Sequence, residues 1–157
     1  MIEKRLVGID KSSDVGKFRL VIKNQCKMIV VTADDSALMR ERIINQLKEF
    51  GDDITVIEAS NGLEALDMII MHHPELAILD LRMPGLNGLE VLRKIRAAGL
   101  NSRICILTSY PYPQYMEKCM EAGADYFLSK TEDFGKLNLA IAEVLKNDGT
   151  DKLVLKQ

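Results

Sequence analysis

The sequence predicts an α/β fold in which a five-stranded parallel sheet is covered by five helices. Short apolar runs rich in β-branched residues alternate with longer amphipathic segments over about 120 residues, and parallel neighbours need such helical crossovers. The run 77–79 enters Asp80 without polar alternation, which is typical of a strand buried on both faces. A length of 157 residues with 47% hydrophobic residues suits one domain plus tails.

The five expected strands are short apolar runs bounded by polar or turn residues. They lie at 28–32, 54–58, 76–79, 104–107 and 126–128. The first two, MIVVT and ITVIE, carry the β-branched side chains that favour strands. Because right-handed crossovers leave few orders for five parallel strands, we expect a flavodoxin-like, doubly wound sheet with the order 2-1-3-4-5.

Two helices are expected between the first three strands. The first follows Ser36, whose hydroxyl can cap it, and ends at Gly51. The second follows Asn61 and ends before Pro74. Apolar residues recur in both at helical spacings, which predicts their inward faces. These residues are Leu38, Ile43, Ile44, Leu47, Phe50, Leu63, Leu66, Ile69 and Ile70.

Three further helices complete the alternation. The third covers 87–98 and is closed by Gly99, the fourth runs from Pro113 to Gly123, and the last covers about 134–146. The same helical spacing predicts their inward faces. The residues are Leu89, Val91, Leu92 and Ile95 in the third helix, Met116, Cys119 and Met120 in the fourth, and Phe134, Leu137, Ile141, Val144 and Leu145 in the last.

We expect one domain at 28–147, flanked by an N-terminal extension and a C-terminal tail. The extension, 1–27, holds two apolar-basic runs around a turn-rich connection, so it is expected to be a hairpin or a flexible segment. Met28 is the first residue of the first expected strand, which leaves open whether translation starts there. The tail, 148–157, is too short for another domain and is expected to fray.

Charge and hydropathy exclude several classes of protein. The net charge is -2 and the basic residues are scattered, which argues against direct binding to nucleic acid. No apolar run approaches the roughly 18 residues of a membrane span, and the N-terminus lacks the apolar core of a signal peptide. We therefore expect a cytoplasmic protein without a membrane partner.

The cysteines and histidines do not indicate a metal or redox site. Cys26, Cys105 and Cys119 lack metal-ligand spacing and are expected to be buried, inert thiols. His72 and His73 are adjacent, so their side chains diverge on a helix, and we expect a solvated helix end.

Polar residues follow four of the five expected strands. Asp34 and Asp35 follow the first strand, Asp80 the third, Thr108 the fourth and Lys130 the fifth. In the expected strand order these ends meet at one edge of the sheet, where parallel α/β proteins bind ligands. Crowded carboxylates resist ionisation unless a cation joins them, and carboxylate oxygens suit Mg2+. The sequence therefore predicts a magnesium site at this edge.

Five segments resemble the receiver domain of two-component response regulators. They are VVTADDS, EASNGLEAL, AILDLRMPGLNGLEVL, ICILTS and EAGADYFLSK, and the resemblance covers 28 to about 146. The pattern is most similar to receivers that precede a helix-turn-helix output domain, and we expect no such output domain in this chain.

The resemblance implies a phosphorylated aspartate with a bound metal ion. By position, Asp80 would be the residue phosphorylated on its carboxylate. Asp35 would hold Mg2+ directly and Asp34 mainly through water, and the carboxylate of Asp80 and the backbone carbonyl of Arg82 would be further ligands.

The same resemblance assigns a switch and an output surface. Thr108 would hydrogen-bond the phosphoryl group and Lys130 would pair with it. Phe127, three residues before Lys130, occupies the switch-aromatic position. Coupled movement of Thr108 and Phe127 would alter the helix-strand-helix face at 113–146.

Simpler structural roles stay open for each of these residues. Asp34 and Asp35 would then only cap a helix, and Asp80 would be a turn residue. Thr108 would cap the end of a strand, Lys130 would be a solvated amine, and Phe127 would be a core residue that does not switch.

The function expected from these residues is that of a stand-alone receiver. A histidine kinase or phosphotransfer protein would phosphorylate it, and it would signal to a downstream protein as a monomer or a phosphorylation-dependent homodimer. It would be no enzyme beyond self-phosphorylation and autodephosphorylation. A phosphorylation-independent adaptor is the alternative. A phosphatase for external substrates ranks last, because Arg82 stands where it would need a second carboxylate.

Two departures from the receiver pattern bear on the mechanism. Thr131 follows Lys130 where many receivers have a proline and a cis peptide bond, so we expect no cis bond here. The stretch 110–113, YPYP, contains two prolines and is expected to be stiff. Arg82 and Tyr110 lie two residues beyond Asp80 and Thr108, where their bulk would slow attack of water on the phosphoryl group.

Overall fold

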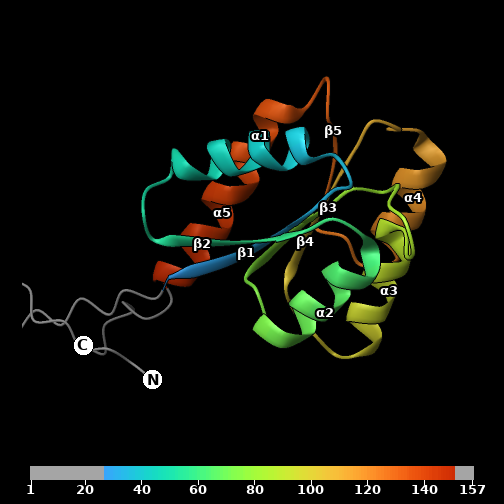
Figure 1. The fold of residues 1–157 in the computed structure, drawn as a ribbon, viewed down its shortest axis with the longest axis horizontal. Helices are drawn as coiled ribbons and strands as arrows, with labels where there is room; N and C mark the ends of the chain where they lie inside the picture. The colour runs from blue at the N-terminus through green and yellow to red at the C-terminus, as the bar shows by residue number, and fades with distance from the viewer. Residues whose placement is uncertain (1–26, 151–157) are drawn as a thin grey trace, which may run out of the picture.

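The computed structural model describes residues 27–150 and shows a parallel sheet between two layers of helices (Figure 1). The five strands are β1 (Met28–Ala33), β2 (Ile54–Ala59), β3 (Leu76–Leu79), β4 (Arg103–Thr108) and β5 (Tyr126–Ser129). Their order is β2-β1-β3-β4-β5 and every pair is parallel, which confirms the expected topology. The expected hairpin or flexible segment, Cys26 and the end of the tail lie outside the described residues.

The helices are divided between the two faces of the sheet. They are α1 (Ala37–Lys48), α2 (Gly62–His72), α3 (Gly88–Ala97), α4 (Pro113–Glu121) and α5 (Leu137–Thr150). The side chains of α1 and α5 share one core cluster with one face of the sheet, and those of α2, α3 and α4 share the other. Figure 1 shows α1 and α5 together on one side of the strands and α2 with α3 on the other.

The central strand β3 is fully enclosed between these layers. Its residues Leu76 to Leu79 are at most 1% exposed. This burial explains the continuous apolar run, because both faces of a central parallel strand are covered by helices. The strand pairs with β1 on one side and β4 on the other. Asp80 follows directly, so its position is fixed by the most deeply buried strand.

The helix starts lie where the capping residues predict them. Ser36 and Asn61 accept backbone N–H groups at 3.3 and 2.9 Å at the starts of α1 and α2. Asn87 and Glu90 form a capping box at α3. Helix α2 is followed by its C-cap His73, which takes the left-handed conformation with φ of 45° before Pro74. Each of these caps satisfies N–H or C=O groups that the helix itself leaves unpaired.

The inward face predicted for the fourth helix is partly wrong. Cys119 is buried, but Met116 and Met120 are 47% and 46% exposed. The helix instead packs through Cys119 together with the half-buried Tyr115 and Ala122. These three positions are spaced four and three residues apart, so they form one narrow stripe that leaves both methionines at its side.

The predicted faces of α1 and α2 are also too wide. Leu38, Leu63 and Ile70 are 78%, 57% and 47% exposed. The fully buried side chains are Ile43 and Leu47 in α1, and Ala65 and Ile69 in α2. In each helix the two buried side chains lie four positions apart and form a narrow stripe that covers the strands. Apolar residues beside this stripe stay at the surface.

The last helical segment differs at both ends from its predicted range of 134–146. Phe134 to Lys136 form a 3-10 turn, η1, and α5 begins at Leu137. The ring of Phe134 is covered by the guanidinium of Arg42, whose Cζ lies 3.8 Å from the ring centroid. Helix α5 continues through Gly149, because a glycine costs a helix only about 1 kcal/mol and does not forbid it.

The burial expected for the two described cysteines and the exposure expected for both histidines are confirmed. Cys105 and Cys119 are buried free thiols, and burial raises the pKa of Cys105 to about 12. His72 and His73 are exposed at the end of α2. Within residues 27–150, no helix combines the length and apolar character that crossing a membrane requires.

Gly88 leaves no room for a side chain beneath the loop that carries Asp80. A Cβ at Gly88 would lie 2.3 Å from the carbonyl oxygen of Asp80 and 3.1 Å from the Cα of Leu81. We expect Gly88→Ala to lower the free energy of unfolding by about 2 kcal/mol, because backbone must move to admit the methyl group. Urea unfolding measures the change.

Gly135→Ala is the matched control for this substitution. Apart from Gly135 and its chain neighbours, nothing lies within 4 Å of a Cβ built at Gly135, so the free energy of unfolding of this variant should stay within about 0.5 kcal/mol of the wild type. Equal losses for both variants would contradict the steric explanation.

Candidate functional site

The carboxyl ends of β1, β3 and β5 bring two buried aspartates against one buried lysine. The ammonium of Lys130 lies 2.6 Å from Oδ2 of Asp34 and 3.1 Å from Oδ2 of Asp80. These side chains are at most 9% exposed. Segments nearly 100 positions apart in the sequence thus meet in one charged cluster, as the strand order predicts.

Burial and charge shift the ionisation of this cluster. Burial raises the pKa of the Asp80 carboxyl above its usual value; the charge of Lys130 partly opposes this shift and the charge of Asp34 adds to it. Burial alone would lower the pKa of Lys130, but the hydrogen bond to Asp34 and the charge of Asp80 outweigh it and raise that pKa. Lys130 is therefore held in its charged form.

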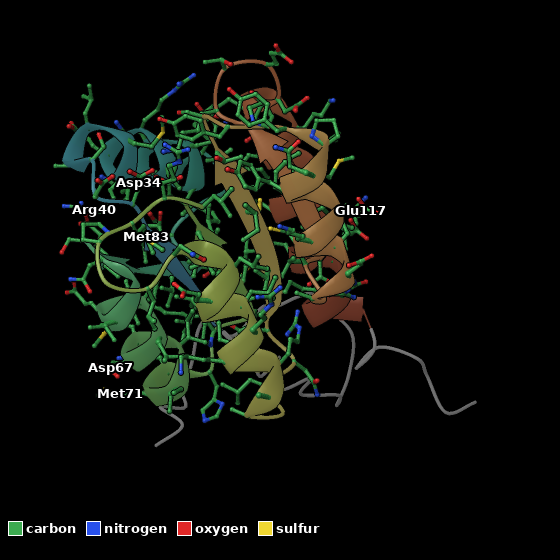
Figure 2. The ribbon with its side chains drawn as sticks, turned by 90° about the vertical axis from the view of Figure 1, so that its right-hand side faces the viewer. Asp34, Arg40, Asp67, Met71, Met83 and Glu117 are labelled. Atoms are coloured by element: carbon green, nitrogen blue, oxygen red, sulfur yellow. The ribbon has the colours of Figure 1, made fainter. Side chains whose placement is uncertain are left out.

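The loop after β1 fixes Asp34 through both its side chain and its backbone. Oδ1 of Asp34 accepts the backbone N–H of Ser36 at 2.9 Å, while Oδ2 accepts from Lys130. The carbonyl oxygen of Asp34 accepts from the guanidinium of Arg40 at 2.8 Å, and Arg40 also pairs with Glu58 on β2 at 2.9 Å. Figure 2 shows Asp34 and Arg40 at the same corner of the molecule.

Arg40 is a site residue that the sequence analysis did not identify. It belongs to no motif, and its contact with Glu58 depends on β1 and β2 being neighbours. In the sequence, Arg40 is marked only as a basic residue one turn into α1, and Glu58 as an acidic residue near the end of β2.

Asp35 completes a group of three carboxylates that fits a divalent cation. One oxygen each of Asp34, Asp35 and Asp80 lies within 4.8 Å of the others, and Asp35 is exposed. Three carboxylates face a single ammonium, so negative charge is in excess. Mg2+ is commonly held by one or two carboxylates with water completing its shell, and an exposed Asp35 beside two fixed partners suits that arrangement.

Thr108 ends β4, and the hydrogen bond of its side chain goes to the Tyr110 backbone and not to Asp80. Its hydroxyl accepts the backbone N–H of Tyr110 at 3.0 Å, and its carbonyl accepts that of Lys130 at 2.9 Å. Among the described residues no hydrogen bond joins its side chain to Asp80. Phe127 is half-buried and in register with Ile106, two residues before Thr108 on the same face of β4. Thr108 and Phe127 are thus neighbours on one face of the sheet.

Arg82 and Tyr110 form a stacked pair above the loop that follows β3. The guanidinium carbon of Arg82 lies 3.8 Å from the centroid of the Tyr110 ring. The backbone N–H of Arg82 points to Oδ1 of Asp80 at 3.4 Å. The backbone of Arg82 thus contacts the Asp80 carboxylate while its side chain stacks on Tyr110, and the restriction of water by this pair stays a prediction.

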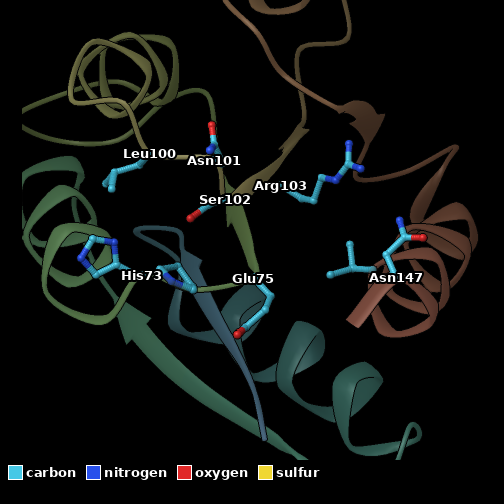
Figure 3. Close-up of a pocket in the computed structure, with 9 residues that line it drawn as sticks. His73, Glu75, Leu100, Asn101, Ser102, Arg103 and Asn147 are labelled. Carbon is cyan, nitrogen blue, oxygen red and sulfur yellow. The ribbon is translucent and has the colours of Figure 1, made fainter. Parts of the chain in front are cut away.

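A separate pocket of about 350 Å³ opens at the amino ends of β3 and β4, the opposite edge of the sheet (Figure 3). Its charged groups are already occupied within the protein. Glu75 accepts the backbone N–H of Ile29 at 2.5 Å, and Arg103 pairs with Asp125 at 2.9 Å. We assign no function to this pocket.

The arrangement agrees with a known family. A family model described as the response regulator receiver domain matches residues 30–142. The chain belongs to this family. Receiver domains act in two-component signalling, where they interact with histidine kinases or phosphotransfer proteins, and they typically bind Mg2+ through acidic residues. Apart from autophosphorylation, they are generally not enzymes.

Relatives of this receiver include regulators and isolated receiver domains. It is 37% identical over 139 residues to a nitrate/nitrite response regulator protein homolog of Haemophilus influenzae, covering 85% of this chain and 66% of that protein. The receiver domain of NarL from Mycobacterium tuberculosis is 31% identical with a TM-score of 0.69, and the match covers 76% of this chain and 97% of that one.

A DNA-binding response regulator of the LuxR family from Staphylococcus aureus is similar in structure as well. It is 32% identical with a TM-score of 0.68, over 74% of this chain and 98% of that one. The receiver spans only about a third to two thirds of the length of the first curated relatives it matches.

The raised pKa of Asp80 predicts a pH-dependent gain in stability when its charge is removed. Below the ordinary pKa of 3.8 the carboxyl is neutral in both the folded and unfolded states; above it, ionisation disfavours the folded state. In the absence of divalent ions, Asp80→Asn should raise the free energy of unfolding by about 1 kcal/mol at neutral pH, and less near about pH 4.

Urea unfolding at both pH values measures this gain. Glu117→Gln, at an exposed position of α4 (Figure 2), is the control and should change little. A gain that is larger at the lower pH would contradict the assigned direction.

Proposed function

We propose that this receiver accepts a phosphoryl group on Asp80, from a histidine kinase or phosphotransfer protein and with Mg2+, and signals through protein contacts. One observation carries the proposal: the ammonium of Lys130 contacts both Asp34 and Asp80 beside the exposed Asp35. Such a set supplies a nucleophilic carboxylate, donors for a metal ion and a fixed positive charge, which phosphoryl transfer requires.

The carboxylates differ in how much of each is available to a metal ion. Both side-chain oxygens of Asp34 already accept hydrogen bonds, from Ser36 and Lys130, so Asp34 would act mainly through water. Asp35 is exposed and would bind the ion directly, and the carboxylate of Asp80 and the backbone carbonyl of Arg82 would add ligands. Bound Mg2+ supplies positive charge to the oxygens of the phosphoryl group during transfer.

Asp80 is the nucleophile in the proposed transfer. One of its carboxylate oxygens attacks phosphorus, the bond from phosphorus to the donor atom breaks, and the donor keeps the bonding electrons. With a phosphohistidine donor the leaving group is the imidazole. Lys130 stays charged and pairs with the phosphoryl oxygens, because its pKa is raised by its acidic neighbours.

The phosphoryl group then provides acceptors that the free site lacks. The hydroxyl of Thr108, which now accepts from the Tyr110 N–H, would turn to donate to a phosphoryl oxygen. Phe127, its neighbour on the same face of the sheet, would move into the space that Thr108 leaves. The two side chains thereby link the reactive edge to β5 and α4.

Helix α4 offers an apolar stripe that suits a protein partner on the 113–146 face. Tyr112, Met116 and Met120 are 51%, 47% and 46% exposed and lie four residues apart. Exposed apolar groups at this spacing fit the side of a second helix or strand, and methionine adapts its shape to a partner. Signalling through this stripe would take place by contact with a protein and not by binding to DNA.

Phosphorylation of Asp80 is tested by incubation with Mg2+ and acetyl phosphate. We expect the intact protein to gain the mass of one phosphoryl group in a Mg2+-dependent manner, and Asp80→Ala to gain none. Asp53→Ala is the control, because Asp53 is an exposed carboxylate before β2 and should leave the gain unchanged. A mass gain that survives Asp80→Ala, or none in the wild type, would instead favour a phosphorylation-independent adaptor.

The stack of Arg82 on Tyr110 predicts a long phosphate lifetime. Removing both side chains as Arg82→Ala with Tyr110→Ala should open a path for water and speed dephosphorylation about tenfold, which corresponds to about 1.4 kcal/mol of barrier. Loss of the phosphoryl group from purified phosphoprotein, followed by mass spectrometry, measures the rate. Arg93→Ala, an exposed arginine of α3, should not change it. An unaltered rate in the double variant would show that the stack does not restrict water.

A further inference from the structure

The loop between β5 and η1 is closed on itself by hydrogen bonds around Lys130. The hydroxyl oxygen of Ser129 accepts the backbone N–H groups of Thr131 at 3.3 Å and Glu132 at 3.2 Å. The carboxylate of Asp133 accepts the backbone N–H of Ser129 at 3.1 Å, and the Asp133 N–H donates to the Ser129 carbonyl at 3.0 Å. Two side chains thus bind three backbone N–H groups within five residues.

The bond from Ser129 to Asp133 replaces a missing strand neighbour. Strand β5 is at the edge of the sheet, so a backbone N–H that points away from β4 has no partner strand. Ser129 is 1% exposed, and a buried N–H without an acceptor destabilises the folded state. The Asp133 carboxylate supplies that acceptor, and Lys136 holds the carboxylate from the other side at 2.5 Å.

Lys130 is part of this closed loop, and its main chain is also hydrogen-bonded to β4. Its backbone N–H donates to the Thr108 carbonyl at 2.9 Å, so its main chain is fixed on both sides. No peptide bond of the described residues is cis, so the loop keeps its shape through these hydrogen bonds with a trans Lys130–Thr131 bond. A lysine side chain has many rotamers, and a fixed main chain limits the positions that its ammonium can take.

We propose that Ser129 and Asp133 are positioning residues that hold the Lys130 ammonium against Asp34 and Asp80. The hydrogen bonds of both side chains stay within the loop and to Lys136, so they act on the site only through Lys130. Their effect on phosphoryl transfer rests on the proposed function, whereas their effect on the lysine does not.

The position of Lys130 is measured first without any phosphodonor. The native protein is treated with an amine-reactive ester, and labelling of Lys130 is followed by peptide mass spectrometry. Because the ammonium is buried and paired, Ser129→Ala and Asp133→Ala should each raise its labelling rate at least about fivefold. Ser129→Thr and Asp133→Asn keep an oxygen acceptor at each position and should restore most of the protection.

Lys136→Ala is the matched control for the labelling experiment. It removes the exposed ion pair to Asp133 but leaves the bond from Asp133 to Ser129, so Lys130 should stay protected. Thermal unfolding of each variant sets the labelling temperature, which is kept below the transition of the least stable variant so that every comparison is made on folded protein. Unchanged Lys130 labelling in folded Ser129→Ala and Asp133→Ala would overturn the proposal.

Phosphorylation by acetyl phosphate provides a second measurement. Each alanine variant should be phosphorylated about tenfold more slowly than the wild type. In a Lys130→Ala background the same substitutions should cause no further slowing, because they act through that residue. A further tenfold loss in that background would show a merely structural role. A wild type that takes no phosphoryl group would refute the proposed function, while the labelling result would still decide the role of the loop.

Discussion

The pairing of one buried lysine with two buried aspartates is the interaction on which the rest of this site depends. Burial makes ionised Asp80 unfavourable, and the charge of Lys130 offsets part of that cost. The offset is incomplete, because Asp34 shares the same ammonium. The cluster therefore keeps an excess of negative charge, and Asp35 exposes it to solvent at the edge of the sheet. This excess charge favours the binding of a cation.

The sheet topology explains why most of this site could be predicted from the sequence. A parallel sheet with the order β2-β1-β3-β4-β5 brings the carboxyl ends of its central strands to one edge. Once the strands are identified, the positions of Asp34, Asp80 and Lys130 follow to within a residue. The helix caps were also predictable, since Ser36 and Asn87 act through bonds to residues three positions away.

Features that depend on side-chain packing could not be predicted in the same way. Apolar periodicity placed Met116 and Met120 inside, because it cannot tell which of two adjacent stripes faces the sheet when both are apolar. Arg40 reaches a backbone carbonyl and a residue of another strand, so no local pattern marks it. The loop that holds Lys130 depends on an acceptor four residues from an edge-strand N–H, a relation visible only in three dimensions.

Because its inward stripe is narrow, α4 is held less firmly on the sheet than the other helices. This nine-residue helix has one fully buried side chain, the thiol of Cys119, and no side-chain cap at its start, so few contacts fix its position. Helix α3, in contrast, buries three large aliphatic side chains. The least anchored helix is thus the cheapest to displace, and it adjoins the strand whose last residue precedes the lysine.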